Sequence, residues 1–291
     1  MEYHQDRFQD FSLVIVDEKD NIKAILPANR VEDTVFSHQG LTYGGLVINH
    51  KTRLSDYIIL FQEVLKFLNA NEIKNLDLKV LPTIYSDFPS DELEYLAFLC
   101  KADLTRRDTL STIDLESDFK YSHGRKQEVT KANTLSFEVK EENDFDAFWN
   151  EILIPNLNEK HQAKPVHSLS EITLLKKKFP KNIRQFNVYL ESKIVAGTTI
   201  FETERVAHSQ YISGKLNSNT NLSLDFLHHH LITDVFRDKK YFDFGISNEN
   251  QGQKLNSGLL FWKESFGART ITQSFYRFNT KNYEKLNSVL L

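Results

Sequence analysis

The sequence predicts an α+β protein made of two similar units in tandem, of which the first is shortened at its N-terminus. Three observations support this prediction. The chain has 291 residues, a length that suits two domains of ordinary size. Strand-like and helix-like runs alternate along it, as is typical of mixed α/β folds. Finally, the same order of elements (three strands, helix, strand, helix, strand) can be assigned once in each half.

The first half begins with runs rich in β-branched residues, which predict strands. These strands are SLVIVD, IKAILPA and RVEDTVFSHQG, at residues 12–17, 22–28 and 30–40. Residues 53–73 follow as a helix, because large apolar side chains recur there every three or four positions. A strand at 76–81, a helix at 90–102 and a closing strand at 108–115 complete the first half.

The second half repeats this order. Its predicted strands are 186–192, 193–202, 205–213, 241–247 and 268–278, and its helices are 223–239 and 253–267. Ahead of them the sequence predicts a linker from residue 122, a strand at 135–140, and helices from about Asp144 and at 168–178. No such elements precede the strands of the first half, so the first unit should be the shorter one. We therefore expect units at residues 1–120 and 121–291.

Composition limits the compartment and the classes of partner. The formal net charge of −4 provides no overall positive field that would attract DNA. The single cysteine, Cys100, cannot form an internal disulfide and fits a reducing compartment. The polar N-terminus, MEYHQDRFQD, is unlike a signal peptide, and the apolar runs are too short to span a membrane. The sequence thus predicts a soluble cytoplasmic protein.

Two segments and the order of elements resemble a known family. Residues 241–270 combine an aromatic strand ending in Asp-Phe-Gly, a turn containing glycine, and the pattern Phe-x-Lys-x-x-Phe-Gly. Residues 7–48 are similar to the first unit of bacterial members. Over almost its whole length the chain resembles the Fem-type aminoacyltransferases and the wider FemAB-like group. The resemblance implies two tandem units with the fold of GNAT acyltransferases.

The resemblance also implies an activity. It suggests an N-acyltransferase that moves an acetyl or aminoacyl group from an acyl-CoA or an aminoacyl-tRNA to an amine. The acceptor would be a small molecule, glycan or peptide, such as an amino sugar or a cell-envelope precursor, and no metal would be needed. The acidic charge balance favours acyl-CoA as the donor, whereas the glycine-poor loop at residues 214–222 favours aminoacyl-tRNA. The alternative is a non-catalytic module of the same fold that binds a glycan or peptide precursor.

The donor loop expected from the resemblance lies at residues 214–222. GNAT enzymes bind the pyrophosphate of coenzyme A with backbone N–H groups of a glycine-rich loop that opens a helix. Here the candidate donor-binding residues are Lys215, Asn217, Ser218 and Asn219. Gly214 lies at the edge of the loop, which has no other glycine, so the backbone can approach a phosphate less closely. We therefore expect acetyl-CoA to bind weakly.

Three residues of the second unit are candidate catalytic residues. Lys263 matches the lysine of the family pattern; it either stabilises developing negative charge or is a surface lysine with an apolar stem. Asp243 lies in an apolar strand, where a carboxylate needs a partner. It could accept a proton from the amine, fix Lys263, or make a structural hydrogen bond. Tyr211 is either a proton donor to the leaving group or a core tyrosine.

Candidate substrate-binding residues lie in two segments. The stretch SHQGLTYGGLVI, residues 37–48, holds three of the ten glycines and is either an acceptor-side loop or a tight structural turn. Its candidates are His38, Gln39, Gly40, Tyr43, Gly44 and Gly45. Arg125 and Lys126 either contact a phosphate or belong to a solvated basic helix face.

Three consecutive histidines, His228, His229 and His230, do not predict a metal site. Consecutive side chains of a helix point about 100° apart, so the three rings cannot converge on one ion. We therefore assign no metal ligand.

Overall fold

The computed structural model describes residues 6–42, 44–215 and 220–290, which form two compact units. The first comprises residues up to Asp108 together with 250–252 and 272–291, and the second comprises 109–249 and 253–271. The units are thus not two consecutive stretches of chain divided at residue 120. The reason is that strands β8 (Asp103–Asp114) and β16 (Arg269–Asn279) each contribute residues to both units.

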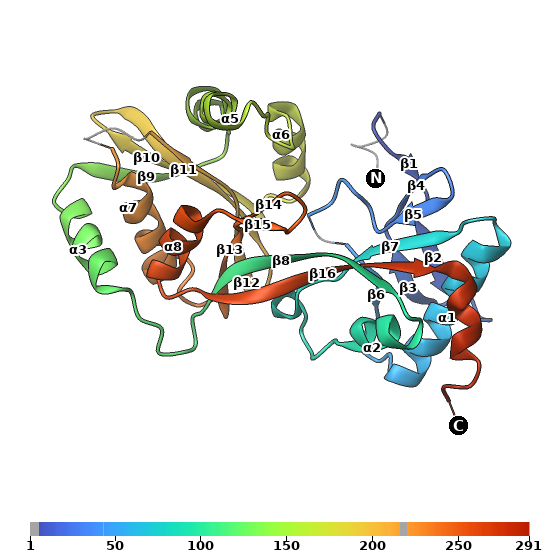
Figure 1. Ribbon diagram of the computed structural model, residues 1–291. Coiled ribbons are helices and arrows are strands. Elements are labelled where there is room, and N and C mark those ends of the chain that lie inside the picture. Colours follow the sequence, from blue (N-terminus) through green and yellow to red (C-terminus); the bar gives the residue numbers. More distant parts are fainter. Residues whose placement is uncertain (1–5, 43, 216–219, 291) are drawn as a thin grey trace. The chain divides into compact units, whose positions relative to one another are not determined.

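The first unit contains two sheets and two longer helices (Figure 1). One sheet has the order β2–β3–β6, and the other has the order β1–β4–β5–β7–β16 within this unit. The strands are β1 (Gln9–Asp10), β2 (Leu13–Val16), β3 (Ile22–Leu26), β4 (Asn29–Val31), β5 (Thr34–Phe36), β6 (Val47–Ile48) and β7 (Asn75–Lys79). The helices are α1 (Leu54–Ala70), α2 (Glu92–Leu99) and the 3-10 turns η2 (Thr83–Tyr85) and η5 (Thr280–Leu286).

The predicted helix at 53–73 is confirmed as α1, whose apolar side packs into the core of this unit. Of the three paired strands predicted before it, the first two are confirmed as β2 and β3, and the third is wrong. The run predicted as one strand at 30–40 divides into the hairpin β4–β5, because the chain turns at Glu32, where φ is +52°. Strand β3 pairs instead with β2 and β6 in a separate sheet.

The second unit is built on a sheet with the order β8–β13–β12–β11–β10–β9. Its strands are β9 (Phe137–Glu142), β10 (Ile183–Leu190), β11 (Lys193–Glu202), β12 (Val206–Gly214) and β13 (Tyr241–Ile246), with the small hairpin β14 (Asn248–Glu249) and β15 (Lys254–Leu255) beside them. The strands and helices predicted for this half from residue 135 onward are confirmed, with ends shifted by a few residues, except that the start of the predicted helix at 253–267 forms strand β15.

Helices cover both faces of this sheet (Figure 1). One face carries α3 (His123–Ala132), α7 (Ser223–His230), its π-helical continuation η4 (Leu231–Val235) and α8 (Ser257–Ser265). The other carries α4 (Asp146–Phe148), the π-helical turn η3 (Trp149–Leu153), α5 (Ile154–His161) and α6 (Leu169–Lys178). None of the helices in the described ranges is long and apolar enough to cross a membrane.

Helix α3 corrects the prediction of a linker after residue 122. It begins at Ser122, whose Oγ accepts a hydrogen bond from the Arg125 N–H at 3.2 Å. Its buried side chains are those of Arg125, Val129 and Ala132, and the rest of its surface is polar. Because one of the three buried positions is an arginine, the apolar residues alone do not show helical spacing here, and the sequence did not predict the helix.

Each closing strand pairs in the unit of the other half of the chain. Residues Leu110–Asp114 of β8 pair antiparallel with β13 in the second unit. Residues Phe275–Asn279 of β16 pair antiparallel with β7 in the first unit. The two predicted closing strands therefore exist, but they are exchanged between the halves.

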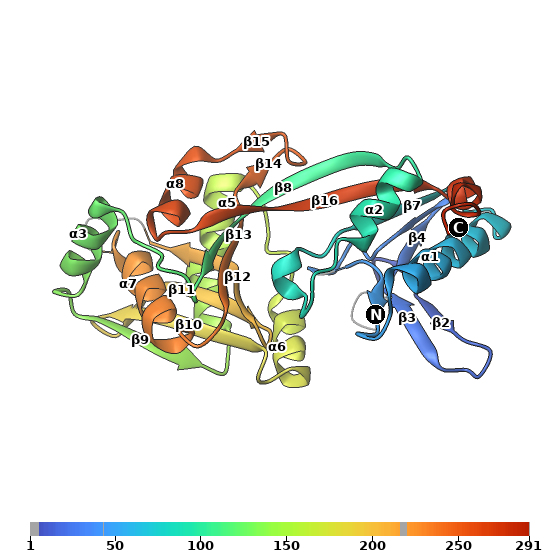
Figure 2. The ribbon, with the colours of Figure 1, turned by 90° about the horizontal axis from the view of Figure 1, so that it is seen from below.

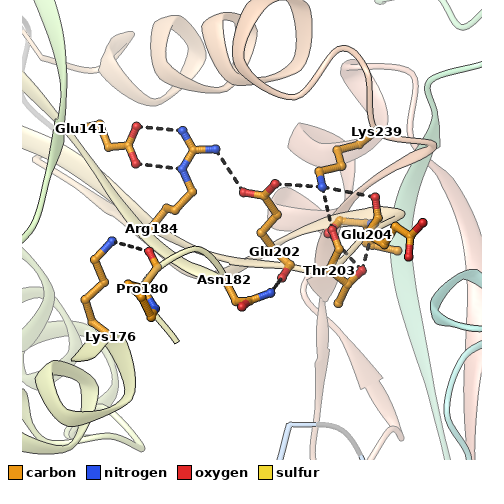
Figure 3. Close-up of polar contacts among 10 residues, drawn as sticks. Glu141, Lys176, Pro180, Asn182, Arg184, Glu202, Thr203, Glu204 and Lys239 are labelled. Atoms are coloured by element: carbon orange, nitrogen blue, oxygen red, sulfur yellow. Dashed lines mark hydrogen bonds and ion pairs between the residues drawn. The ribbon is translucent and has the colours of Figure 1, made fainter. Parts of the chain in front are cut away.

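Charged side chains fix one end of the second unit's sheet (Figure 3). Arg184 of β10 donates two hydrogen bonds to Glu141 of β9, at 2.8 and 2.7 Å, and one to Glu202 of β11, at 3.1 Å. Lys239 lies 2.8 Å from Glu202 and donates to the Thr203 carbonyl. A bidentate arginine shared between carboxylates holds strands more firmly than an isolated surface pair. The network thus links three neighbouring strands.

Candidate functional site

The parallel strands β12 and β13 separate in the middle of the second unit's sheet. Their register runs from Val206–Tyr241 to His208–Asp243 and stops there, although β12 continues to Gly214. Strand β12 also bulges, since its ladder with β11 skips Gln210. The separation therefore opens between two strands at a position fixed by the fold.

A histidine and an aspartate face each other at the last paired position of these strands. His208 Nδ1 lies 3.0 Å from Asp243 Oδ2. Asp243 is fully buried, and its Oδ1 accepts the Gly245 N–H at 2.8 Å and faces the Thr112 hydroxyl at 3.4 Å. Because a carboxylate accepts hydrogen bonds, His208 donates from Nδ1, and Nε2 becomes the basic nitrogen of the ring. The pair has the geometry of a general base oriented by a carboxylate.

Glycine is required at position 245, directly after this pair. Its φ is +70°, a conformation that other residues rarely adopt. A Cβ added there would lie 3.1 Å from His208 Cε1, so a side chain would press against the imidazole. The Asp-Phe-Gly end of the strand thus supplies both the carboxylate and the space for the ring.

Lys263 of α8 is buried and fixes the irregular C-terminal end of β13. Its Nζ donates hydrogen bonds to the carbonyls of Gly245 and Ile246 at 3.0 and 2.6 Å, and its side chain is 2% exposed. Burial lowers the pKa of Lys263 to about 8, an effect that the nearby Asp243 carboxylate partly opposes. Lys263 is thus no surface lysine, and it does not hydrogen-bond to Asp243 but holds the backbone next to it.

Tyr211 lies on the same face of the sheet as His208. Their ladder partners on β11, Thr199 and Phe201, are two residues apart and so point to one side. The Tyr211 hydroxyl accepts the His167 backbone N–H at 3.1 Å and lies 2.6 Å from His167 Nδ1. The predicted proton donor is therefore coupled to a second, buried histidine.

Arg125 is a buried part of the scaffold of this unit. It forms ion pairs with Asp225 of α7 and, at 2.9 Å, with Glu128. Its Nε donates to the Ser265 hydroxyl at 2.9 Å. These contacts join α3 to α7 and α8, whereas the neighbouring Lys126 is exposed. The two basic residues predicted as a pair thus have different surroundings.

The glycines at 44 and 45 close a tight loop between β5 and β6 of the first unit. A Cβ at Gly44 would lie 2.5 Å from the Ser37 carbonyl oxygen, and Gly45 has φ +104°. Lys79, at the end of β7, donates its Nζ to the Leu41 carbonyl at 2.7 Å. Packing within this loop therefore accounts for the two glycines.

The polar residues of the same stretch are held by local hydrogen bonds. His38 is buried with φ +44°, and its Nδ1 accepts the Gly40 N–H at 3.2 Å. Gln39 exchanges two hydrogen bonds with Asn29, at 2.8 and 2.9 Å. Tyr43 lies outside the described residues. These contacts fit the interpretation of residues 37–48 as a tight structural turn at least as well as the interpretation as an acceptor-binding loop.

The candidate donor loop is described only at its ends. Lys215 donates its Nζ to the Ile194 carbonyl at 3.0 Å, and its own carbonyl accepts the Thr220 hydroxyl at 2.7 Å. Asn217, Ser218 and Asn219 lie outside the described residues. Helix α7 begins directly afterwards, at Ser223, as the prediction for this loop requires.

His228 is a neutral core histidine. It lies against the rings of Phe244 and Trp262, and its Nδ1 bonds to the Leu224 carbonyl at 2.8 Å. Burial lowers the pKa of His228 to about 4. His230, by contrast, is partly exposed, with 40% of its side chain accessible and its Nδ1 3.1 Å from Asp234. Across the described side chains, no group of three or more His, Cys, Asp or Glu is placed to hold a metal ion.

The fold matches solved structures over nearly its full length. FemX is 9% identical, with a TM-score of 0.66, covering 96% of this chain and 90% of that one. The C-terminal domain of a putative lysylphosphatidylglycerol synthetase from Agrobacterium fabrum is 11% identical, with a TM-score of 0.61, covering 94% and 87%. L-PGS from Bacillus licheniformis is 12% identical, with a TM-score of 0.59, covering 92% and 84%.

No family model matches the sequence, and no curated protein does. Identities of 9–12% to solved structures establish the fold alone. The chain therefore has the mixed α+β fold of tandem GNAT-like units that FemX also has, as the sequence predicted.

Proposed function

We propose that this protein is an N-acyltransferase that transfers an acetyl or aminoacyl group from an acyl-CoA or an aminoacyl-tRNA to an amine. The observation that carries the proposal is the His208–Asp243 pair at the point where β12 and β13 separate. The fold shared with FemX supports the class of reaction. The fold by itself would fit a binding module equally well, whereas a buried base–carboxylate pair is suited to proton transfer.

The proposed reaction is a direct attack of the amine on the activated acyl carbonyl. His208 Nε2 takes a proton from the ammonium form of the acceptor, while Asp243 holds the ring in the required tautomer. The amine nitrogen then bonds to the carbonyl carbon, and the bond from that carbon to the thiol or ribose oxygen of the donor breaks. Backbone N–H groups at the separated strands would stabilise the oxyanion. As the amide forms, the nitrogen loses its second proton and the leaving group takes up one proton, while His208 releases the first proton to solvent, so charge and atoms balance.

Two further residues would support this step. Lys263 keeps the C-terminal end of β13 in place through the carbonyls of Gly245 and Ile246, and its positive charge lies near the reacting centre. It therefore acts as a positioning residue in the proposal. Tyr211 would protonate the leaving group, and His167, hydrogen-bonded to its hydroxyl, would return the proton.

The proposal also covers the donor and the acceptor of the reaction. The name of the Agrobacterium domain refers to a lysyl group, which supports an aminoacyl donor. The net charge of −4 favours acyl-CoA over a tRNA. Amino sugars and cell-envelope precursors are the proposed acceptors, from the resemblance to the Fem group.

The proposal is tested with two donors in parallel. Release of thiol from acetyl-CoA is measured with a panel of primary amines, and transfer of labelled amino acid is measured from a pool of charged tRNAs. His208→Gln should abolish the observed activity, and His230→Gln, which changes a partly exposed histidine, should retain it. Tight binding of an acceptor with no turnover of either donor would favour the binding module instead.

A further inference from the structure

The small sheet β2–β3–β6 of the first unit has apolar side chains on both faces. Its inner face packs into the core through Leu13, Ile15, Ala24, Leu26 and Ile48. Its outer face, defined here by Val14, Val16, Ile22, Ile25 and Val47, is exposed at 58%, 46%, 57%, 39% and 56% respectively. An antiparallel sheet with one solvated face normally alternates apolar and polar residues. The outer face has the composition of a buried surface.

The strand register makes this outer face continuous. Val14 pairs with Ile25, and Ile25 pairs with Val47, so one row of branched aliphatic side chains crosses all three strands. Val16 and Ile22 pair beside it, at the irregularity between β2 and β3. Figure 2 shows the β2–β3 hairpin at the margin of the first unit. The row is thus contiguous and exposed to a partner.

We propose that a second copy of this chain covers the outer face, in a dimer that packs the two small sheets face to face about a two-fold axis. An isologous contact uses the same patch on both copies, so a self-complementary aliphatic surface suffices. Two sheets of branched side chains pack about 10 Å apart in this way. The proposal is independent of the proposed enzymatic activity.

The area of the outer face fits a modest dimer. The five side chains expose on the order of 400 Å², which is in the range of the largest apolar patch on a typical monomer. Pairing two copies would bury roughly 800 Å² of apolar surface. Because homodimer interfaces are about 65% apolar, the whole interface would bury roughly 1,200 Å², the lower end of the standard size. Interfaces at the low end of the size range are typically weak and reversible, so we take about a micromolar as the working dissociation constant.

Charge at the edge of the outer face argues against a membrane or nucleic acid as the occupant. The turn of the hairpin carries Asp17, Glu18 and Asp20 against Lys19, and Lys23 is paired with Asp17 at 2.9 Å. Anionic lipid headgroups and phosphates would be repelled by this rim. A second copy of the chain presents the same aliphatic outer face, and in the dimer the charged turns of both copies can stay in contact with water.

Sedimentation velocity over a concentration series up to about 100 µM, roughly a hundredfold above a micromolar Kd, tests the proposal. The natural protein should show a reversible monomer–dimer equilibrium. Val14→Lys should weaken dimerisation at least tenfold, because a charge would be buried in the contact. Val31→Lys changes a residue that is similarly exposed, at 48%, in the other sheet of the same unit, and should not alter the equilibrium.

Circular dichroism melting curves of both variants check that they remain folded. A natural protein that stays monomeric throughout the series would overturn the proposal, as would a Val14→Lys variant that dimerises normally. Flotation of a monomeric protein with phosphatidylcholine vesicles would assign the outer face to lipid, and would also overturn it.

Discussion

Asparagine at position 243 should reverse the tautomer of His208 with little change in shape. The amide has the size of the carboxylate, and its oxygen can keep the hydrogen bond from the Gly245 N–H, now 2.8 Å. Its NH2 group then takes the place of Oδ2 and points a donor at His208 Nδ1, 3.0 Å away. Two donors cannot share this contact, so the imidazole should carry its proton on Nε2. That nitrogen could then no longer accept the acceptor's proton.

The size of the effect follows from the step that is lost. General base catalysis contributes about 10²–10⁴ in rate, and an aspartate-to-asparagine change behind a catalytic histidine costs up to about 10⁴ elsewhere. We expect Asp243→Asn to lower kcat by about 10²–10⁴, which corresponds to roughly 3–5 kcal/mol of transition-state stabilisation. The KM of the amine should change little, because the carboxylate is buried behind the ring.

The tautomer can be measured without a substrate. Long-range ¹H–¹⁵N NMR of histidine-labelled protein distinguishes a proton on Nδ1 from one on Nε2, and the His208 signal is identified by its loss in His208→Gln. Asp234→Asn is the matched control, since Asp234 lies 3.1 Å from His230 Nδ1 but is exposed. A His208 ring that keeps its Nδ1 proton in Asp243→Asn would refute this reasoning. Equal loss of activity in the Asp234→Asn control would refute it too.

Three further changes have defined outcomes. Lys263→Met should lower the free energy of unfolding by about 1–3 kcal/mol at pH 7, because one buried and one partly buried carbonyl lose their donor. The folded pKa of Lys263 is about 8, below that of an unfolded lysine, so the free energy of unfolding of the natural protein should rise by up to roughly 3 kcal/mol between pH 8 and 10.5. Urea titrations should therefore show that the Lys263→Met variant becomes less stable relative to the natural protein as the pH rises. His228, with a folded pKa of about 4, should cost up to roughly 3 kcal/mol of stability as the pH falls from 6.5 to 4, and His228→Phe should remove this acid sensitivity in thermal melts. Tyr211→Phe should destabilise by about 1–3 kcal/mol, because the buried His167 N–H loses its acceptor; unchanged stability in urea would show that another group replaces the hydroxyl.

Local patterns predicted most of the elements but not all of their partners. Apolar side chains recur every three or four residues in α1, and β10 and β13 are short apolar runs. Both patterns involve residues close together in the chain, so the sequence locates these elements. Pairing across the chain does not follow from such patterns. Strand β8 has the composition of a closing strand for the first half, yet residues 110–114 pair with β13, about 130 positions later. The hairpin at Glu32 depends on one left-handed residue that is not glycine, which the sequence does not mark as a turn.

The candidate site shows the same division between what is local and what is distant. Asp243 stood out in the sequence because a carboxylate inside an apolar strand requires a partner, and that partner had to be found elsewhere in the chain. His208 is 35 residues earlier and comes opposite Asp243 only through the parallel register of β12 and β13. The sequence offered only a histidine in the predicted strand RVAHSQYIS, among several other polar residues. Lys263 was singled out by its match to the family pattern, but its contacts with two backbone carbonyls depend on the backbone conformation at Gly245. The candidate site thus lies where β12 and β13 stop pairing. This position depends on how the two strands pair, so the sequence of either strand alone does not reveal it.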